Sequence, residues 1–490
     1  MKKLFAMLLA AAMVLSLAAC GQQAAAPAET QAPVVTTAAQ QAAPAIATQA
    51  ATEAATEAAT EAAPKEQIEV TYFCNVGAYR SILEEEIAKF NEGEGKEKGV
   101  YINFDGTINN YSNDLLALLE AGTHFELYDC TSHDDWFEKG WVVPDLTALG
   151  NEELNALVKS YEPYLNNINF TPAGTIFSLP LEIRTMKFAV NLDLLDQFGL
   201  EIPKTWDDVY NIAKTVTEGT NGEKGGLGWC KWSGMYSRLI DQAITGSIGK
   251  YQWDAASESY DFSIYKDIYE NYINKMYAEG LLYGADDLEI DPIRAQFSAG
   301  NVAMFPAVSY DYAVYTVQFP AECNWTICEY PTLKEGEKPY KEMYLNQNGC
   351  CIDQVAYDAA DDAKKQAIID AFIFLNSDYL NGQIYAQAGM IPYKAEVIAN
   401  TKLVDGVGEQ WGKFAEGIEN IVPQPISPDA LLALEGDKFT TVFDDMMHGK
   451  YTFDEAAADL NARYNAAYQE LKEDGDIDLS KYTKPVSFEK

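Results

Sequence analysis

The sequence IEVTYFCNVGAYRSILEEEIAKFNEGEGKEKGVYINFDGTINNYSNDLLALLEAGTHFELYD, residues 68–129, alternates between two kinds of hydrophobic pattern. We expect strands where apolar residues recur at every second position, and helices where they recur at three- and four-residue spacing. The expected elements are a strand over 68–73, a helix over 79–90, a strand over 101–104, a helix over 114–121 closed by Gly122, and a strand over 125–129. This order predicts an α/β fold with parallel strands and right-handed crossovers.

The loops that follow these three strands are the first candidate binding region. In parallel sheets, ligands bind beyond the carboxyl ends of the strands. The loops 74–80, 105–110 and 130–136 are therefore expected to face one cleft. Asn75 and Tyr79 lie in the first loop, although Tyr79 also fits the apolar stripe of the following helix.

Residues 1–19 have the features of a bacterial lipoprotein signal peptide. Two lysines precede the apolar run Leu4–Leu17, which is too short to span a membrane as a mature helix. The run ends in Leu17–Gly21, which resembles a lipobox, so that Cys20 would receive the lipid. The alternative is a plain secretory signal with an incidental cysteine. We expect a mature chain that begins at Cys20, carries palmitate and is anchored to the extracytoplasmic face of the cell membrane.

Residues 20–66 predict a disordered stalk behind that anchor. The segment is mostly Ala, Gln, Thr, Pro and Glu, has no aromatic residue, and includes three copies of Thr-Glu-Ala-Ala over Thr52–Ala63. Such a composition cannot bury enough apolar surface to offset the entropy cost of ordering the chain. The working part of the protein would then start near residue 67 and operate close to the membrane.

The size and charge of the chain restrict the class of partner. The 490 residues carry a formal net charge of −39, which argues against binding to nucleic acid or to an anionic lipid surface. No apolar run after the signal peptide is long enough for a spanning helix. A globular part of this length rarely forms a single core, so we expect two or three lobes in a monomer.

The motifs of the common hydrolases and nucleotide-binding proteins are absent. The chain has three histidines and eight cysteines, without zinc-type spacing, and lacks GxSxG, HExxH and GxxxxGK[ST] sequences. We therefore expect neither a metal nor another cofactor. A disulfide between Cys323 and Cys328 is one possibility, and buried free thiols are the other. The many Asp and Glu residues leave open a glycosidase that uses two carboxylates.

Residues 175–195 read as two short strands that run into a helix, and the segment after them starts another helix. In Leu200–Val209 the chain turns at Pro203, and Thr205 and Asp208 have the spacing of a capping box. We expect Trp206 to be structural, because it would pack the start of this helix.

Several of these segments resemble the extracellular solute-binding proteins of bacterial ABC importers, specifically the carbohydrate-binding group. The order of the segments, over most of 68–471, is more specific than any one of them, and Pro-Lys-Thr-Trp-Asp is the strongest piece. The matching segments are FSLPLE at 177–182 with VNLDLL at 190–195 (family GLPYE…YNKDLF), LEIPKTWDDV at 200–209 (GLxxPKTWDE), QFSAGNVAMF at 296–305 (FxxGKAAM), AFIFLNS at 371–377 with AGMIP at 388–392 (FLxFLTSPEAQ…GGxxP), and a closing helix at 452–463.

This resemblance implies a two-lobe binding-protein fold of type II, in which a sheet flanked by helices forms each lobe and hinge strands join the lobes. Lobe 1 would comprise 67–181 and 306–368, and lobe 2 would comprise 182–305 and 369–490. A sugar, either a mono- or an oligosaccharide, would bind between the lobes, close them and be delivered to permease subunits. The resemblance implies no catalysis.

Sugar sites combine flat aromatic rings with carboxylates and amides, and this chemistry guides the choice of ligand contacts. Glu182 occupies a position where the family often carries a ligand-binding carboxylate, although it could instead be a solvated hinge charge paired with Arg184. Trp136 could instead pack in the core, and spacing of three suggests that only one of Trp229 and Trp232 faces the cleft. The candidate contacts are Asn75, Tyr79, Asp134, Trp136, Glu182, Arg184, Trp229, Trp232, Tyr310, Asn346 and Tyr393.

Two other functions remain open from the residues alone, namely binding of a charged small solute and hydrolysis of glycosides. Arg184 departs from the small or polar residue usual in the family and could recognise an acidic group. Carboxylates with stacked tyrosines could also suit a charged solute such as a polyamine, because the two-lobe scaffold is widely reused. A surface glycosidase is the alternative from another functional class, and it would show turnover.

Overall fold

The computed structural model describes residues 66–75, 79–106, 111–130, 135–334, 340–475 and 479–490. All of them belong to one unit of mutual contacts, Ala62–Lys490. The predicted signal peptide, Cys20, nearly all of the predicted stalk and Asp134 lie outside the described residues, so those predictions stay untested. Within the described ranges, no helix combines the length and the apolar character that crossing a bilayer requires.

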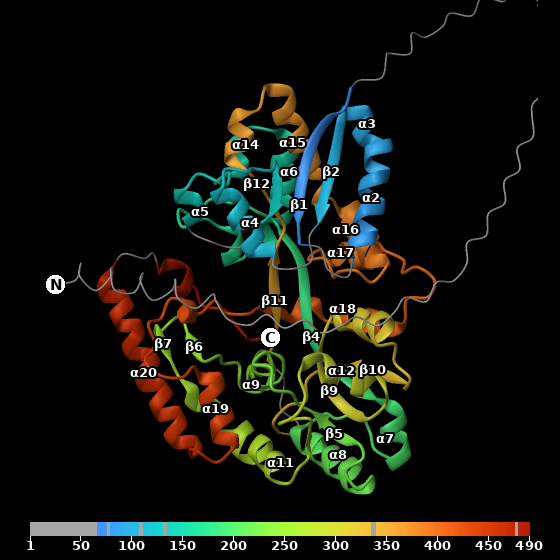
Figure 1. Cartoon of the computed structure of the whole chain (residues 1–490), viewed down its shortest axis with the longest axis vertical. Coiled ribbons are helices and arrows are strands. Elements are labelled where there is room, and N and C mark those ends of the chain that lie inside the picture. Colours follow the sequence, from blue (N-terminus) through green and yellow to red (C-terminus); the bar gives the residue numbers. More distant parts are fainter. Residues whose placement is uncertain (1–65, 76–78, 107–110, 131–134, 335–339, 476–478) are drawn as a thin grey trace, which may run out of the picture. The chain divides into compact units, whose positions relative to one another are not determined.

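The predicted alternation of strands and helices forms a four-stranded sheet, in the order β12-β3-β1-β2. The strands are β1 (Ile68–Cys74), β2 (Val100–Gly106), β3 (Leu127–Asp129) and β12 (Cys350–Ile352). β1 pairs in parallel with β2 and β3, as the sequence predicts, while β12 joins β3 in antiparallel orientation. The helices α2 (Arg80–Glu92) and α4 (Tyr111–Glu120) make the two crossovers (Figure 1).

Helices from a distant part of the chain complete the core of this lobe. α15 (Asp362–Leu375) packs on β1 and β2, and α16 (Asp378–Ala386) packs on α2. The rings of Phe90 and Phe374 are stacked with their centroids 4.2 Å apart. The helices α15 and α16 therefore belong to lobe 1, which is the lobe built around the four-stranded sheet.

The second sheet defines lobe 2 and has the order β13-β11-β4-β9-β5-β8, with β10 paired to β4. Its central strand β4 is continuous between two sets of partners. One end pairs with β11, where Arg184 lies opposite Leu345, and the other end pairs with β9, where Met186 lies opposite Val308. The strands are β4 (Pro180–Asn191), β5 (Gly225–Gly228), β8 (Leu282–Tyr283), β9 (Val302–Val308), β10 (Trp325–Cys328), β11 (Glu342–Asn348) and β13 (Ile421–Pro423).

The prediction of two short strands before the helix at 192 was wrong. A single twelve-residue strand forms because both halves of β4 find hydrogen-bonding partners. The charge of Lys187, which interrupts the apolar pattern, is accommodated in the interior: its Nζ lies 2.7 Å from Glu329 Oε1 and 3.1 Å from Glu342 Oε2. Pairing of the buried charge allows the strand to continue.

The lobe boundaries differ from the predicted ones at two places. Residues 306–348 were expected in lobe 1, but β9 continues through Val308 and both β10 and β11 pair with β4, so this segment lies in lobe 2. Residues 369–390 were expected in lobe 2, but they pack in the core of lobe 1. The predicted boundaries followed the order of the motifs, whereas strand pairing between distant segments decides the lobe.

The helix α8 (Trp206–Gly219) begins as its sequence predicts. The backbone N–H of Thr205 donates to Asp208 Oδ2 at 2.9 Å, and the N–H of Asp208 donates to Thr205 Oγ1 at 3.2 Å. Trp206 is fully buried, as expected. On the facing strand β5, a Cβ at Gly226 would lie 2.0 Å from Ala213 Cα, so glycine is required for this close approach.

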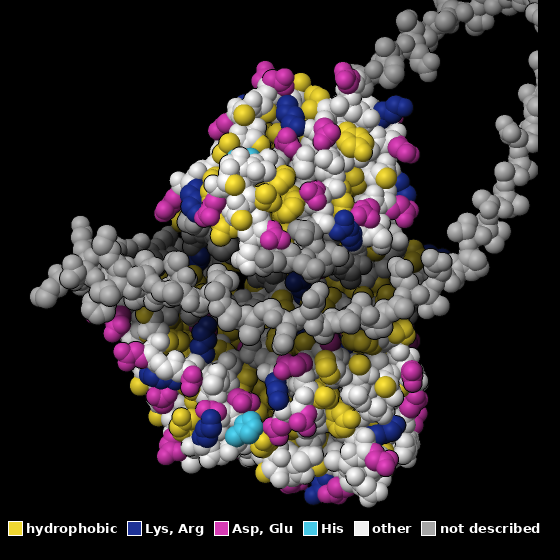
Figure 2. All heavy atoms as spheres, viewed as in Figure 1, with side chains coloured by type: hydrophobic (Ala, Val, Ile, Leu, Met, Phe, Trp, Pro, Cys, Tyr) yellow, Lys and Arg dark blue, Asp and Glu magenta, His cyan; other side chains and the backbone are white. Residues whose placement is uncertain are grey.

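None of the seven cysteines among the described residues forms a disulfide, and five of them are buried. Figure 2 shows Asp and Glu side chains spread over the visible face rather than gathered at one place. The other elements are α3 (Glu94–Lys98), α5 (Asp135–Glu138), α6 (Glu152–Tyr161), α7 (Leu192–Phe198), α9 (Asp241–Ile248), β6 (Trp253–Asp254), β7 (Ser259–Tyr260), α10 (Lys266–Ile268), α11 (Asn274–Ala278), α12 (Ile290–Ser298), α13 (Asp311–Ala313), α14 (Gln354–Ala359), α17 (Ala395–Asn400), α18 (Glu409–Ala415), α19 (Phe439–Met447) and α20 (Phe453–Asp474), together with π-helical turns at Tyr236–Ile240, Tyr269–Ile273 and Val314–Gln318 and short 3-10 turns.

Candidate ligand-binding site

A cavity of about 520 Å³ brings together four of the predicted contacts, and we call it the interlobe cavity. Tyr79 comes from the start of α2 in lobe 1, whereas the other three come from β4 and from the end of β9 in lobe 2. The walls therefore derive from segments on both sides of the hinge. The lining residues are Tyr79, Glu182, Arg184, Tyr310, Ala313, Val314, Val317, Gln318 and Gly389.

Glu182 and Arg184 form an ion pair on one face of β4. Alternate residues of a strand point to the same side, which places both side chains on the cavity wall. Arg184 Nε donates to Glu182 Oε1 at 2.5 Å, and the Glu182 side chain is only 7% exposed, against 34% for Arg184. Among the described residues, neither the two Nη groups of Arg184 nor Glu182 Oε2 makes another hydrogen bond. The pair thus presents free donors beside a free acceptor.

Tyr79 is one of the residues that lobe 1 contributes to the cavity wall: it is 6% exposed, is the N-cap residue of α2 and packs in the core of lobe 1. Its role as a ligand contact stays a prediction. Burial, together with the Glu182 and Asp129 carboxylates, raises the pKa of Tyr79 well above its usual value, so the hydroxyl stays neutral and can donate. A Cβ at Gly389 would lie 2.6 Å from Tyr79 Cβ, so Gly389 permits the loop after α16 to approach Tyr79 closely.

Asp129 fixes the ends of β1 and β3 behind Tyr79. Its carboxylate accepts from the Tyr72 O–H at 2.6 Å and from the Asn75 backbone N–H at 2.8 Å. Burial raises the pKa of Asp129 to about 6, although these hydrogen bonds favour the ionised form. Asn75, a predicted contact, is therefore anchored through its backbone, while its side chain is exposed and lines neither cavity described here.

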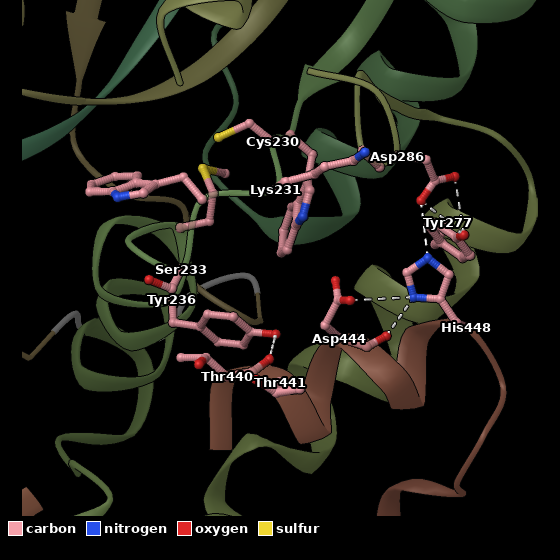
Figure 3. A pocket seen from close by; sticks show the side chains of 14 residues that line it. Cys230, Lys231, Ser233, Tyr236, Tyr277, Asp286, Thr440, Thr441, Asp444 and His448 are labelled. Atoms are coloured by element: carbon pink, nitrogen blue, oxygen red, sulfur yellow. Dashed lines mark hydrogen bonds and ion pairs between the residues drawn. The ribbon is translucent and has the colours of Figure 1, made fainter. Parts of the chain in front are cut away.

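A second cavity of about 450 Å³ lies within lobe 2, and we call it the lobe-2 cavity (Figure 3). His448 bridges two acidic residues at its edge, because Nε2 lies 3.1 Å from Asp286 Oδ1 and Nδ1 lies 2.7 Å from the Asp444 carbonyl oxygen. The hydrogen bond to the Asp444 carbonyl and the two acidic groups raise the pKa of His448. The lining residues are Trp229, Cys230, Lys231, Trp232, Ser233, Met235, Tyr236, Tyr277, Ala285, Asp286, Thr440, Thr441, Asp444 and His448.

Both predicted tryptophans line the lobe-2 cavity, and neither is among the described residues that line the interlobe cavity, where one of them was expected. The spacing argument assumes regular structure, but the segment from Trp229 to Trp232 follows β5 as an irregular turn. Trp229 N–H donates to the Tyr283 carbonyl at 2.9 Å, and Lys231 N–H donates to the Leu288 carbonyl at 3.0 Å. Trp229 is 2% exposed, whereas Trp232 is half-buried.

The Arg238 side chain lies between the walls of the two cavities and contacts an aromatic residue of each wall. The Arg238 guanidinium lies 4.7 Å from the centroid of the Trp232 ring and 5.4 Å from that of Tyr310. It donates to the Tyr310 hydroxyl through Nη2 and to Asp311 Oδ2, at 2.9 Å, through Nη1. Trp232 lines the lobe-2 cavity and Tyr310 lines the interlobe cavity, so this buried cation is shared by the walls of both.

Two of the remaining predicted contacts, Trp136 and Tyr393, line neither cavity. Trp136 is 1% exposed and packs edge-on against Tyr128 and Trp141, in agreement with its alternative interpretation as a core residue. Tyr393 is 4% exposed and packs against Tyr344, with the ring centroids 5.8 Å apart. Asn346 pairs with Ile183 through β11, and its side chain, like Asp134, lies outside the described residues.

Sequence reasoning missed most of the lobe-2 cavity and one wall of the interlobe cavity. Arg238 carried a usable signal, because it is an isolated cation in the apolar segment MYSRLI, where a charge requires a buried partner. The turn Val314–Gln318 and His448 carried none, because only the tertiary fold brings them to the cavities. Among the described residues, no group of three or more His, Cys, Asp or Glu is arranged to hold a metal ion.

The sequence model of the family described as "Bacterial extracellular solute-binding protein" matches residues 76–341, more than half of the chain. The chain belongs to this family. Members of this family are extracytoplasmic, and the family is one of binding proteins. The matched region contains β4, both tryptophans of the lobe-2 cavity and Tyr310.

Solved structures share the fold at low sequence identity. An ABC substrate-binding protein from Listeria monocytogenes in complex with cycloalternan superposes with a TM-score of 0.61 at 15% identity, over 82% of this chain and 98% of that chain. The GacH receptor of Streptomyces glaucescens, solved unliganded and with acarbose, gives 0.61 at 16% identity over 82% and 98%. The maltose-maltodextrin binding protein of Alicyclobacillus acidocaldarius gives 0.57 at 16% identity over 80% and 98%. These matches identify the two-lobe fold of type II binding proteins.

Proposed function

We propose that this family member is the substrate-binding subunit of an ABC importer, and that it captures a neutral sugar in the interlobe cavity. The observation that carries the proposal is the Glu182–Arg184 pair, whose free edges offer one acceptor and two donors side by side. A sugar hydroxyl both donates and accepts, so neighbouring hydroxyls can use both edges at once. Tyr79 and Tyr310 add the aromatic walls against which the apolar faces of a sugar pack.

The ion pair also argues against a charged ligand. A carboxylate that approached Arg184 would meet Glu182 beside it, and an ammonium group that approached Glu182 would meet Arg184. The two charges cancel, so the cavity favours a polyhydroxylated ligand without net charge over an acidic sugar or a polyamine. The cavity volume of about 520 Å³ lies in the range of small-molecule sites. The similar Listeria and Streptomyces proteins were solved in complex with cycloalternan and acarbose, which supports a carbohydrate as the ligand.

The cavity also argues against the glycosidase alternative. Glycoside hydrolysis uses two carboxyl groups that flank one bond, at separations of about 5 to 9.5 Å. Among the described lining residues of the interlobe cavity, Glu182 is the only acid. The proposal is therefore binding without turnover, followed by delivery of the sugar to permease subunits.

We also propose that Cys20 carries the lipid that keeps the protein at the extracytoplasmic face of the cell membrane, as a monomer on the stalk of residues 20–66. The support comes from the lipobox-like sequence and the composition of the stalk. Metabolic labelling with an alkyne analogue of palmitate should label the wild type and not Cys20→Ala. Equal labelling of the variant would contradict the anchor without touching the sugar proposal.

The ligand class is tested by thermal shift with a panel of neutral oligosaccharides, uronic-acid oligosaccharides and polyamines. Ligand binding to the folded state raises the melting temperature by mass action, so the neutral sugars should give the shift. A shift with polyamines alone, or with uronates alone, would overturn the assignment. Incubation with chromogenic glycosides should release no product, and sustained release by the pure protein would make it an enzyme.

A further inference from the structure

Arg238 is a deeply buried cation next to the walls of the two cavities, and it lies in an unusual turn. Its side chain is 3% exposed, and it projects from the π-helical turn Tyr236–Ile240. A second π-helical turn, Val314–Gln318, contributes to the wall of the interlobe cavity. Turns of this kind are rare and frequently occur at functional sites, because they re-aim the side chains of one helical turn.

The charge of Arg238 is only partly neutralised by its ion-pair partner. Asp311 is fully buried and accepts from two guanidinium groups, from Arg238 at 2.9 Å and from Arg294 at 2.5 Å. The single carboxylate of Asp311 thus pairs with two cations, although Arg294 also forms an ion pair with Asp291, which is half exposed. The remaining positive charge of Arg238 is stabilised by the faces of Trp232 and Tyr310 and by the Tyr310 hydroxyl oxygen.

The hydrogen bond between Arg238 and Tyr310 sets the direction of the Tyr310 hydroxyl. A phenol oxygen that accepts from a guanidinium has its own O–H left to donate. Among the described residues, this O–H has no acceptor, and Tyr310 lines the interlobe cavity. A ligand oxygen is the acceptor that the cavity can supply.

We infer that Arg238 is a positioning residue, which holds Tyr310 as a hydrogen-bond donor toward the ligand and couples Tyr310 to Trp232 across the two cavities. This inference deepens the proposed function, since the ligand of the interlobe cavity is the proposed sugar. It assigns to Arg238 a role that acts through Tyr310 and Trp232, without contact between Arg238 and the ligand.

The coupling is testable without any ligand. The eight tryptophans are replaced by 5-fluorotryptophan, and Trp232→Phe identifies the ¹⁹F resonance of Trp232. Tyr310→Phe removes the acceptor of Arg238, so the guanidinium over Trp232 should move and the Trp232 resonance should shift. In the Arg238→Met background, Tyr310→Phe should leave that resonance in place. Arg238→Lys provides a second background, because a single ammonium group cannot bridge Asp311 and the Tyr310 oxygen as the guanidinium does.

Tyr312→Phe is the matched control. Tyr312 is the neighbouring tyrosine, and its hydroxyl accepts from the Gly408 backbone N–H at 2.7 Å instead of from Arg238. Its substitution should leave the Trp232 resonance unchanged. The inference is overturned if Tyr310→Phe leaves the Trp232 resonance unmoved in the wild-type background. It is also overturned if Tyr310→Phe moves that resonance as far in the Arg238→Met and Arg238→Lys backgrounds as in the wild-type background.

A second measurement tests the donor role on any neutral oligosaccharide that binds. Tyr310→Phe and Arg238→Met should each raise the Kd about three- to tenfold, and the double variant should raise it no further than the larger single effect. Additive losses would overturn the claim that Arg238 acts through Tyr310. If no sugar binds while the ligand-free coupling is present, the proposed function fails and the role of Arg238 in positioning Tyr310 stands.

Discussion

Arg184 donates to Glu182 at 2.5 Å from the same face of β4, and each side chain keeps an unused edge toward the cavity between the lobes. The pair occupies the strand that leads from one lobe into the other. A ligand that engages both edges is therefore held at the hinge, where it can also touch Tyr79 from lobe 1 and Tyr310 from lobe 2. Contacts that form in full only when the lobes close make closure depend on the ligand.

Glu182→Gln should weaken sugar binding by at least ~1 kcal/mol, about fivefold in Kd, because an amide is a poorer acceptor for a ligand hydroxyl than a carboxylate. Isothermal titration with the sugar found by thermal shift measures the change. Glu85→Gln is the control, since Glu85 is 59% exposed on the outer face of α2. Unchanged affinity in Glu182→Gln would remove this residue from the site.

Gly389→Ala should weaken binding more than it destabilises the fold. The new methyl group would come within 2.6 Å of Tyr79 Cβ and of Ile384 Cγ2, so the Tyr79 wall must shift. Gly412→Ala, where a Cβ meets nothing within 4 Å, is the matched control and should be neutral or slightly stabilising in its helix. Titration calorimetry and thermal melts distinguish the two effects. Equal affinity for both variants would contradict the role assigned to Gly389.

Two buried carboxyl groups should make the protein more stable in mild acid than at neutral pH. Burial raises the pKa of Asp129 to about 6 and that of Asp241 to about 7, both from about 3.8 in the unfolded chain. The folded state therefore binds these protons more tightly, and each group lowers the stability as the pH rises from about 4 to its folded pKa. The slope is about 1.4 kcal/mol per pH unit for each group while only the folded form is protonated.

Asp241→Asn isolates one of these contributions, because the amide can still accept from the Tyr265 O–H that now donates to Asp241 at 2.5 Å. Urea denaturation at several pH values should show a flatter profile between pH 4 and 7 for this variant than for the wild type. Asp405→Asn, at an exposed position, should keep the wild-type profile. A wild-type slope in Asp241→Asn would show that this carboxyl group is not the titrating group.

Lys187→Met should destabilise the protein by about 3–5 kcal/mol, because it leaves the 7% exposed Glu342 without its cation. The double variant Lys187→Met/Glu342→Gln removes both charges and should recover most of the loss. Chemical denaturation of the two single variants and the double variant gives the coupling energy. Additive losses would mean that the pair is not energetically linked. A direct contact at 3.1 Å makes additivity the unexpected result.

The sequence predicted local structure best where a pattern reports directly on chain geometry. The strand–helix alternation of 68–129 and the capping box at Thr205 and Asp208 form as expected, because each depends on neighbouring residues. The division into lobes does not follow the prediction, because the strands β9, β10 and β11 pair with β4 although they lie more than a hundred residues after it in the chain. Such pairing leaves no trace in local periodicity.

The residues of the candidate site likewise fall into those that the sequence predicted and those that only the tertiary structure reveals. Tyr79, Glu182, Arg184 and Tyr310 were predictable, either from their places at strand ends or from positions that the family uses, and the structure brings them to one cavity. Arg238 was missed because its function depends on two rings that reach it from distant segments. Trp136 was chosen as an aromatic residue in a loop, but only burial reveals that it packs in the core.

Small-angle X-ray scattering with and without the stabilising sugar measures the central claim most directly. Binding in the interlobe cavity should draw the lobes together and reduce the radius of gyration of the wild type, while Glu182→Gln at the same sugar concentration should show a smaller reduction. A radius of gyration that stays constant at saturating sugar, with binding established by calorimetry, would contradict the account.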